Sequence, residues 1–388
     1  MSTRGALSSL IAVSAAVLAG VSPAAAFTWN APLALTATGH DAIGREGIAR
    51  IGSNDAIVAF WDTSVGSTPQ VHVRRTTDGG AHWTPSVTIS AAGVTGERAS
   101  VAADGQTVVA SFAGGAACPN APCGLQVARS VDGGVTWDVP ETLSGGIASD
   151  SEITIRGLTA VVAWNDRVTG KVRVRVSTDG GDTFNSASLL DTTTNLIGAT
   201  AEARASVAIG SGVIYVSYIS DSHTLKLRRS TDGGVTWHPA QTISTQATGL
   251  WGQDLAASGN TAVVAFARYV SPDVWIAYRR TSNRGVAWSG ASNLTSPSAP
   301  TATNPIVDVQ GGTWRVLYTR CLVTDCSTAA IFVRTAPDAQ TWATQVRVTP
   351  GPGPDFAPGG SVVAGKLIVA YTKVRTDTTE DVNVRTGN

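Results

Sequence analysis

A segment of eight residues, typical of a tight turn, recurs along the chain about every fifty residues. The clearest copies are SVDGGVTW at 130–137 and STDGGVTW at 230–237, with the variants TTDGGAHW at 76–83 and STDGGDTF at 177–184. Two eroded copies follow, TSNRGVAW at 281–288 and TAPDAQTW at 335–342. The closing aromatic residues are spaced by 54, 47, 53, 51 and 54 residues, and a further step of 54 back from Trp83 reaches Trp29. A period of this length indicates seven repeated structural units.

Each unit contains four strand-like runs in a fixed order. In the second unit they are ERASVAA, TVVASF, LQVARS and TWDVPETLS, and the fourth unit repeats them as ARASVAI, VIYVSYI, LKLRRS and TWHPAQTIS. Four short strands with an aromatic residue at a fixed place are typical of a propeller blade. The sequence therefore predicts an all-β fold over residues 27–388, a seven-bladed β-propeller of four-stranded antiparallel blades.

The two ends of the chain are predicted to share one blade. The last unit has three runs, GGSVVA, KLIVAY and VNVRT, whereas the run TWNAPLALT near the N-terminus supplies only a fourth strand. We expect residues 29–36 to pair antiparallel with residues 382–386, because this pairing removes a sheet edge that each would otherwise expose.

Residues 1–26 have the features of a secretory signal peptide. Arg4 precedes a short apolar run from Leu10 to Val21, and Ala24, Ala25 and Ala26 form a small-residue cleavage pattern. The run is shorter than the ~20 apolar residues that span a bilayer, although an uncleaved anchor is the alternative. We expect a secreted, extracellular protein, with the periplasm or the cell surface left open.

The four cysteines form two local pairs, Cys118 with Cys123 and Cys321 with Cys326. An exported chain favours disulfides, and the two pairs are too far apart in sequence to suggest one Cys₄ metal site. We predict the disulfides Cys118–Cys123 and Cys321–Cys326, in loops between the second and third strands of the second and sixth blades.

Charge and motifs narrow the classes of partner. Lys+Arg and Asp+Glu both number 28, so no net field favours nucleic acid, and we expect neither a nucleic-acid partner nor a membrane span in a monomeric protein. No nucleotide or hydrolase motif is present, and no cofactor or metal site is predicted. Structural calcium on surface aspartates is left open, because no ligand spacing defines it.

The aspartates of the repeated segment are expected to be structural. Asp78, Asp132, Asp179 and Asp232 can accept backbone N–H groups within the turn, while the glycines adopt positive φ and the aromatic residue packs between blades. The pattern Ser/Thr-x-Asp-x-Gly-x-Thr-Trp resembles the Asp box, or bacterial neuraminidase repeat, of the sialidase-like β-propellers. The resemblance implies that these turns join third and fourth strands on the face opposite the binding site.

On that opposite face, the starts of innermost strands and the nearby loops are rich in polar and aromatic residues. The candidates for ligand binding are Arg45, Glu46, Glu97, Arg98, Glu152, Arg204, His223, Trp251 and Asp254. Arginine can hold a carboxylate with two parallel hydrogen bonds, so this set suits an acidic sugar. The alternative is that these groups pair with one another or with water around a hydrated channel.

The resemblance to sialidases also implies catalytic roles. The segment Val58 to Asp62 resembles the one bearing the family's general acid, so Asp62 takes that role, with Glu202 supporting Tyr269 as nucleophile. Arg45, Arg98 and Arg204 would form the arginine cluster. The family's Phe/Tyr-Arg-Ile-Pro motif is absent, and seven blades exceed the six of the catalytic domain, which favours a glycan-binding protein. The alternatives are a sialidase-like glycoside hydrolase, a lyase using His223 or His40, and a protein-interaction scaffold.

Overall fold

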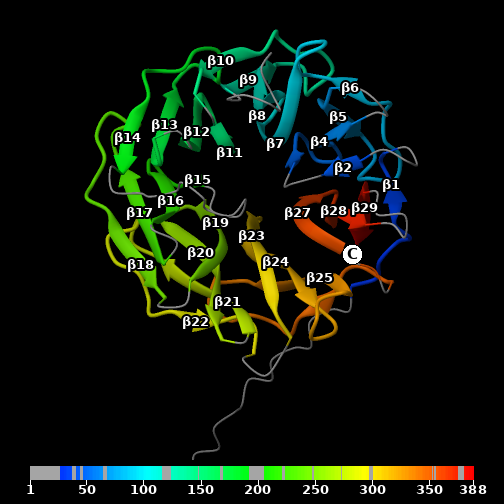
Figure 1. Cartoon of the computed structure of the whole chain (residues 1–388), viewed down its shortest axis with the longest axis vertical. Coiled ribbons are helices and arrows are strands. Elements are labelled where there is room, and N and C mark those ends of the chain that lie inside the picture. The colour runs from blue at the N-terminus through cyan, green and yellow to red at the C-terminus, as the bar shows by residue number, and fades with distance from the viewer. Residues whose placement is uncertain are drawn as a thin grey trace, which may run out of the picture.

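The computed structural model describes residues 27–36, 41–43, 47–63, 68–115, 124–146, 148–166, 169–191, 205–220, 223–246, 249–271, 273–296, 300–351, 353, 355–374 and 380–388, with only the backbone for 41–43, 62–63, 149–150, 251 and 357. The described part contains strands and no helix, so no helix there could cross a membrane. Seven antiparallel sheets form a ring, which confirms the predicted seven-bladed propeller (Figure 1).

The first four blades follow the chain from the channel outward. Blade 1 comprises β2 (Asp41–Ile43), β3 (Ile48–Arg50), β4 (Ala56–Thr63), β5 (Gln70–Thr76) and β6 (Val87–Thr88), where β2 and β3 both pair with β4 as two parts of the innermost strand. Blade 2 comprises β7 (Thr95–Asp104), β8 (Thr107–Gly115), β9 (Gly124–Ser130) and β10 (Glu141–Ser144). Blade 3 comprises β11 (Ala148–Arg156), β12 (Thr159–Asp166), β13 (Lys171–Ser177) and β14 (Ser188–Asp191). Blade 4 comprises β15 (Ser206–Ile209), β16 (Ile214–Ser220), β17 (Thr224–Ser230) and β18 (Gln241–Thr245).

The remaining blades continue the pattern and then close it. Blade 5 comprises β19 (Leu250–Ser258), β20 (Thr261–Val270), β21 (Asp273–Thr281) and β22 (Ser292–Asn293). Blade 6 comprises β23 (Ala302–Gln310), β24 (Thr313–Cys321), β25 (Ala329–Ala336) and β26 (Val346–Arg347). Blade 7 comprises β27 (Asp355–Val363), β28 (Lys366–Val374), β29 (Glu380–Gly387) and the N-terminal β1 (Leu33–Ala34).

The predicted closure of the ring is confirmed. Leu33 of β1 lies opposite Val384 of β29, and an isolated bridge joins Trp29 to Gly387. The Leu35 N–H adds a hydrogen bond of 2.7 Å to the Val382 carbonyl. The outermost strand of blade 7 therefore comes from the opposite end of the chain.

The ring has two distinct faces. The turns between first and second strands lie beside the repeated turns between third and fourth strands, because Gly133 N donates to the Gln106 carbonyl and Gly180 N to the Leu158 carbonyl, both at 2.8 Å. We call this side the turn face. The opposite side carries the connections between blades and the loops between second and third strands, and we call it the loop face.

One apolar cluster fills each interface between neighbouring blades. Every cluster contains an aromatic residue from the second strand and the aromatic residue that closes a repeated segment. The second-strand aromatics are Phe60, Phe112, Trp164, Tyr218, Phe266, Tyr318 and Tyr371, and the closing aromatics are Trp83, Trp137, Phe184, Trp237, Trp288, Trp342 and Trp29. The closing aromatic residues therefore pack between neighbouring blades, as the sequence predicts.

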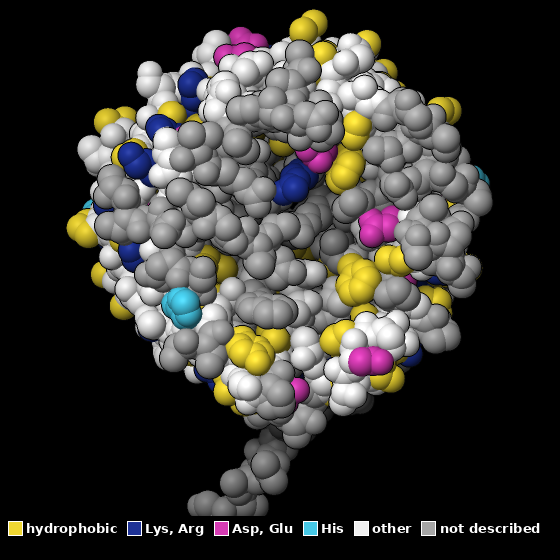
Figure 2. Space-filling model, viewed as in Figure 1, with side chains coloured by type: hydrophobic (Ala, Val, Ile, Leu, Met, Phe, Trp, Pro, Cys, Tyr) yellow, Lys and Arg dark blue, Asp and Glu magenta, His cyan; other side chains and the backbone are white. Residues whose placement is uncertain are grey.

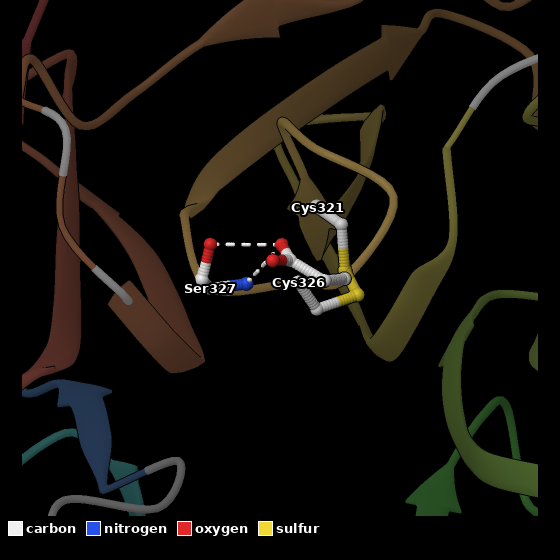
Figure 3. Close-up of a disulfide and its surroundings, with 4 residues drawn as sticks. Cys321, Cys326 and Ser327 are labelled. Carbon is white, nitrogen blue, oxygen red and sulfur yellow. Dashed lines mark hydrogen bonds between the residues drawn. A yellow bond between two sulfur atoms is a disulfide. The ribbon is translucent and has the colours of Figure 1, made fainter.

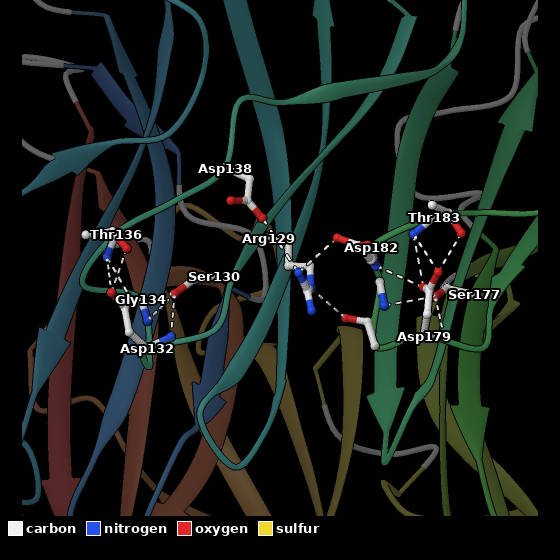
Figure 4. A network of polar contacts seen from close by, with 12 residues as sticks. Arg129, Ser130, Asp132, Gly134, Thr136, Asp138, Ser177, Asp179, Asp182 and Thr183 are labelled. Atoms are coloured by element: carbon white, nitrogen blue, oxygen red, sulfur yellow. Dashed lines mark hydrogen bonds and ion pairs between the residues drawn. The ribbon is translucent and has the colours of Figure 1, made fainter.

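The repeated turns are held by the aspartate that follows their first Ser or Thr. In blade 2, Asp132 accepts hydrogen bonds from Ser130 Oγ (2.8 Å), from Thr136 N (2.9 Å) and from Thr136 Oγ1 (2.6 Å). These bonds from Thr136 hold the pKa of Asp132 below its usual range. Figure 4 shows Arg129 between two such turns, with its Nη1 3.0 Å from Asp182 Oδ1 in blade 3. Asp78, Asp179 and Asp232 occupy the same place in their turns.

A second repeated polar contact joins neighbouring blades through arginine. Arg334 of β25 donates from Nε to the Ala343 carbonyl of its own blade (2.7 Å) and from Nη1 to the Leu294 carbonyl of blade 5. Arg279 makes the same pair of contacts with Ser289 and Ile243, and Arg385 makes them with Asn30 and Val348. We call each of these an arginine clamp, because one guanidinium ties two blades.

The predicted disulfide of blade 6 is confirmed. Cys321 and Cys326 are bonded at an S–S distance of 1.98 Å in the loop between β24 and β25, and Ser327 N donates to Asp325 Oδ1 (3.0 Å) in the same loop (Figure 3). Cys118 and Cys123 lie outside the described residues, as does the predicted signal peptide at 1–26.

Candidate functional site

The innermost strands enclose a polar channel. One cavity of this channel has a volume of about 560 Å³, and its wall includes Arg50, Ser100, Glu152, Asp254 and Asp308 from five different blades. Figure 2 shows one face of the ring, hollowed at its centre, with basic and acidic side chains beside the hollow. The channel is therefore the place where unlike charges from distant parts of the sequence meet.

Bulges shape the loop-face ends of five innermost strands. The register shifts between Glu97 and Ser100 in β7, and at corresponding places in β11, β19, β23 and β27. Within the first of these bulges, Arg98 has a φ of 60°, a left-handed conformation that costs an L-residue roughly 1–2 kcal/mol. Such bulges commonly re-aim a side chain beside a functional site. The half-buried Arg98 is thus held at the loop face at an energetic cost.

Deeper in the channel, two carboxyl groups share one hydroxyl. Ser206 Oγ lies 3.0 Å from Glu152 Oε1 and 2.8 Å from Asp254 Oδ1, and it accepts the Leu255 N–H at 3.1 Å. The hydroxyl has one hydrogen and can donate it to one carboxylate at a time. Burial, and then the charge of Asp254, raise the pKa of Glu152 well above its usual range. Glu152 therefore retains its proton at a pH where an exposed glutamate has lost it.

These groups also connect the innermost strands to one another. Four successive contacts run around the channel, each from a backbone N–H to a side chain of the preceding blade: Ile153 to Ser100 (3.4 Å), Val207 to Glu152 (3.1 Å), Leu255 to Ser206 (3.1 Å) and Val307 to Asp254 (2.6 Å). We call this series the inner belt. It joins blades 2 to 6, while the equivalent residues of blades 6, 7 and 1 are Ile306, Gly359 and Gly47, which have no side-chain acceptor.

One further acid lies on the channel wall. Asp308 pairs with Arg315 at 3.0 Å between Oδ2 and Nη1. Burial raises the pKa of Asp308 to about 6, and the charge of Asp254 acts in the same direction while Arg315 opposes the rise. Asp308, Arg315 and Ser206 were not predicted from the sequence. A charged residue inside an otherwise apolar innermost strand is the signal that could have identified Asp308.

The predicted ligand-binding residues divide into four groups. Glu97 and Arg98 lie at the loop-face mouth, whereas Glu152 and Asp254 lie in the channel and Asp254 is 5% exposed. His223 is exposed in the turn between β16 and β17, farther from the channel wall. Outside the described residues lie Arg45, Glu46 and Arg204, together with the side chain of Trp251.

Of the three predicted catalytic residues, only Tyr269 has a described side chain. Tyr269 is half-buried at the end of β20, packs against the cluster between blades 5 and 6, and donates its N–H to the Gly249 carbonyl at 3.1 Å. Glu202 and the side chain of Asp62 lie outside the described residues. Among the residues that are described, no group of three or more His, Cys, Asp or Glu side chains is placed to hold a metal ion.

The described residues form a seven-bladed β-propeller with a polar channel along its axis, and solved propellers have a similar fold. No protein-family model and no curated protein matches the sequence. A polysaccharide lyase of family PL25, an ulvan lyase, is similar with a TM-score of 0.59 at 11% identity, over 89% of this chain and 93% of the lyase. The endosialidase of phage phi92 has a TM-score of 0.56 at 11% identity, over 93% of this chain and 69% of that one.

A sialidase extends the comparison. A mutant of the Trypanosoma rangeli sialidase with trans-sialidase activity has a TM-score of 0.53 at 12% identity and covers 92% of this chain. The chain spans only 58% of that sialidase's length. These likenesses show a sialidase-like β-propeller fold, as the repeated segment predicts, and at such identities they show the fold alone.

Proposed function

We propose that this chain is a secreted carbohydrate-binding propeller that holds an acidic glycan at the loop-face mouth of its channel. The observation that carries the proposal is Arg98, a guanidinium kept at that mouth in a left-handed conformation by a bulge. Backbone strain of this kind persists where the surrounding structure imposes it, and it concentrates at ligand sites. Arginine is also the side chain that best fits a carboxylate.

Two further observations support this proposal. The proteins with a similar fold include sialidases, an endosialidase and an ulvan lyase, the last also solved with a GlcA–Rha3S saccharide at a TM-score of 0.56. The disulfide between Cys321 and Cys326 fits an oxidising compartment, in keeping with the apolar segment that precedes Phe27. We propose that residues 27–388 act as one monomeric domain, with Arg45, Arg204 and Trp251 completing the mouth.

A glycan array followed by titration of the best acidic ligand tests the proposal. Arg98→Gly removes the guanidinium but suits the backbone conformation, so the variant should fold and bind more weakly by ~1.5–3 kcal/mol, or about 10- to 150-fold. Asp132→Ala, on the turn face, is the matched control and should lower stability without changing the affinity of the folded protein. Equal affinity of Arg98→Gly and wild type, with a large loss in Asp132→Ala, would place the site elsewhere.

A glycan-cleaving enzyme is the second candidate, favoured by one observation. Glu152 holds a proton beside Asp254 on the channel wall, and a carboxyl group that stays protonated can act as a general acid. In this alternative, Asp62, Glu202 and Tyr269 take the roles implied by sialidases. A panel of chromogenic acidic glycosides distinguishes the two candidates, since turnover by wild type that is lost in Glu152→Gln and in Tyr269→Phe supports the enzyme.

A further inference from the structure

The described residues form no arginine clamp between blades 3 and 4. Arg228 of β17 occupies the place that Arg279 occupies in β21, two residues before the repeated segment. Arg279 Nη1 donates to the carbonyl of Ile243, which lies at the register shift of the preceding outermost strand. Leu190 lies at the same shift in blade 3. Arg228 forms no hydrogen bond with it or with any other described residue, and Arg228 Nε is buried.

A cavity lies where the clamp would be. Its volume is about 240 Å³, and its wall is made by the end of β14, by β17 and by the residue before β18. The lining residues are Leu189, Leu190, Asp191, Lys226, Arg228 and Ala240. Because β14 is the outermost strand of blade 3, the cavity lies near the outer edge of the ring (Figure 1), and it shares no lining residue with the channel cavities. The Arg228 side chain therefore borders a space that a small molecule can enter.

The charges of this wall favour a ligand with a single negative charge. Lys226 Nζ lies 3.0 Å from Asp191 Oδ2, so these two opposite charges offset each other. Arg228 follows Lys226 by two residues on the same side of β17, roughly 7 Å farther along the strand, and has no acidic partner among the described residues. Two cations and one carboxylate leave one positive charge, located on Arg228. A guanidinium can hold a carboxylate through two parallel hydrogen bonds.

The rest of the wall is apolar. Leu190 is buried in the cluster between blades 3 and 4, whereas Leu189 and Ala240 are exposed to solvent. A ligand with a short aliphatic body would cover these side chains and remove apolar surface from water, which favours binding. Inorganic sulfate has no such body, and it carries one charge more than the wall offsets. The wall therefore selects a carboxylate attached to a small apolar group.

We propose that the cavity between blades 3 and 4 is a binding site for a small aliphatic monocarboxylate. The Arg228 guanidinium donates to the carboxylate, and the aliphatic body packs on Leu189, Leu190 and Ala240. The ligand oxygens take the part that backbone carbonyls play in the clamps of the later blades, so the ligand also ties β17 to β14. This site goes beyond the proposed glycan site, with which it shares no residue.

NMR titrations of the full chain with butyrate, its neutral analogue butyramide and inorganic sulfate, at low salt, test this site. Butyrate should bind about tenfold or more tightly than butyramide, and Arg228→Met should lose at least as much affinity for butyrate. Ala240→Trp fills the cavity while it keeps Arg228, and should also abolish binding. Asp191→Asn removes the negative charge of the wall and should strengthen butyrate binding, which damage to the fold would not do. Arg175→Met is the matched control, because Arg175 has the same place on β13, its Nε is also buried, and it does not line the cavity.

Three kinds of result would overturn the proposal. Unchanged butyrate affinity in Arg228→Met, or equal binding of butyramide, excludes a carboxylate site at Arg228. Inorganic sulfate that binds as tightly as butyrate, with Ala240→Trp silent, shows a charged surface without a built cavity. Equal losses in Arg175→Met and Arg228→Met assign the effect to the ring as a whole. Butyrate bound at the loop-face mouth would respond to Arg98→Gly and not to Arg228→Met, so failure of either proposal leaves the other standing.

Discussion

Replacing Arg334 with methionine should weaken the ring at one interface. The change keeps an apolar stem of similar length and removes the two hydrogen bonds from the guanidinium to Ala343 and Leu294. A hydrogen bond to a charged group contributes about 1.5–3 kcal/mol, so two give an upper bound of ~6 kcal/mol. Because Arg334 is only half-buried, water can hydrogen-bond to the freed carbonyls in the variant and offset part of this loss. We therefore expect the free energy of unfolding to fall by about 2–4 kcal/mol.

Urea unfolding followed by tryptophan fluorescence measures this loss, since the chain has 11 tryptophans and many lie between blades. Arg334→Lys should lose more than half as much as Arg334→Met, because an ammonium group cannot hold two separate carbonyls with a planar fork. Arg347→Met is the matched control. It removes one exposed bond, from Nη2 to the Gly351 carbonyl at 2.7 Å, and should cost less than ~1 kcal/mol.

The arginine clamp would be refuted as a stabilising contact by one outcome in particular. If Arg334→Met and Arg347→Met shift the urea midpoint equally, the contacts to the neighbouring blade contribute nothing beyond an exposed hydrogen bond. A lowered midpoint in Arg334→Met with full recovery in Arg334→Lys would assign the effect to charge and not to the fork. The expected order of stability is wild type, Arg347→Met, Arg334→Lys, Arg334→Met.

Three other perturbations test separate parts of the fold. Deleting residues 27–38 removes β1 and leaves the edge of β29 open, so thermal unfolding should show a loss of several kcal/mol, and an unchanged melting temperature would contradict the closure. Cys321→Ser/Cys326→Ser opens a short loop and should cost about 2 kcal/mol in urea, with a larger loss expected only if the cysteines pair elsewhere. The pKa of Asp308 is about 6 in the fold against an ordinary 3.8, so the unfolded chain loses this proton first, and the contribution of Asp308 to stability should fall by about 3 kcal/mol as the pH rises from 4 to 6 and then level off. The urea midpoint should depend less steeply on pH in Asp308→Asn than in wild type. An equally steep dependence in the variant would exclude Asp308 as the cause.

The fold could be predicted because its determinants repeat along the sequence. Aromatic residues such as Trp83 and Trp137 recur at the spacing of one blade, and each fills the same interface in the structure. The pairing of β1 with β29 follows from counting strands. The N-terminal run supplies a single fourth strand and the last unit supplies three strands, so together they complete one four-stranded blade. The arginine clamps have a weaker signal: an arginine lies two residues before the repeated segment in four blades, at Arg74, Arg175, Arg228 and Arg279, yet only the structure shows which carbonyls the clamp arginines reach.

The candidate site was predicted less completely, because its contacts depend on distances across the ring. Glu152 and Asp254 appear in the sequence as charges at the starts of innermost strands, and nothing there shows that Ser206 joins them. The left-handed conformation of Arg98 is likewise set by a bulge whose position depends on pairing with β8. A repeat identifies equivalent positions, whereas the site is made by the positions at which the blades differ.

Because β1 pairs with β29, the ring can close only after β29 has been synthesised. Residues Leu33 and Val384 are neighbours in space although some 350 positions separate them, so the first strand waits unpaired through the synthesis of six blades. A chain cut short within blade 7 would leave β1 without its partner strand, and an open strand edge is a template for aggregation. We therefore expect molecules truncated before β29 to aggregate more readily than the closed ring.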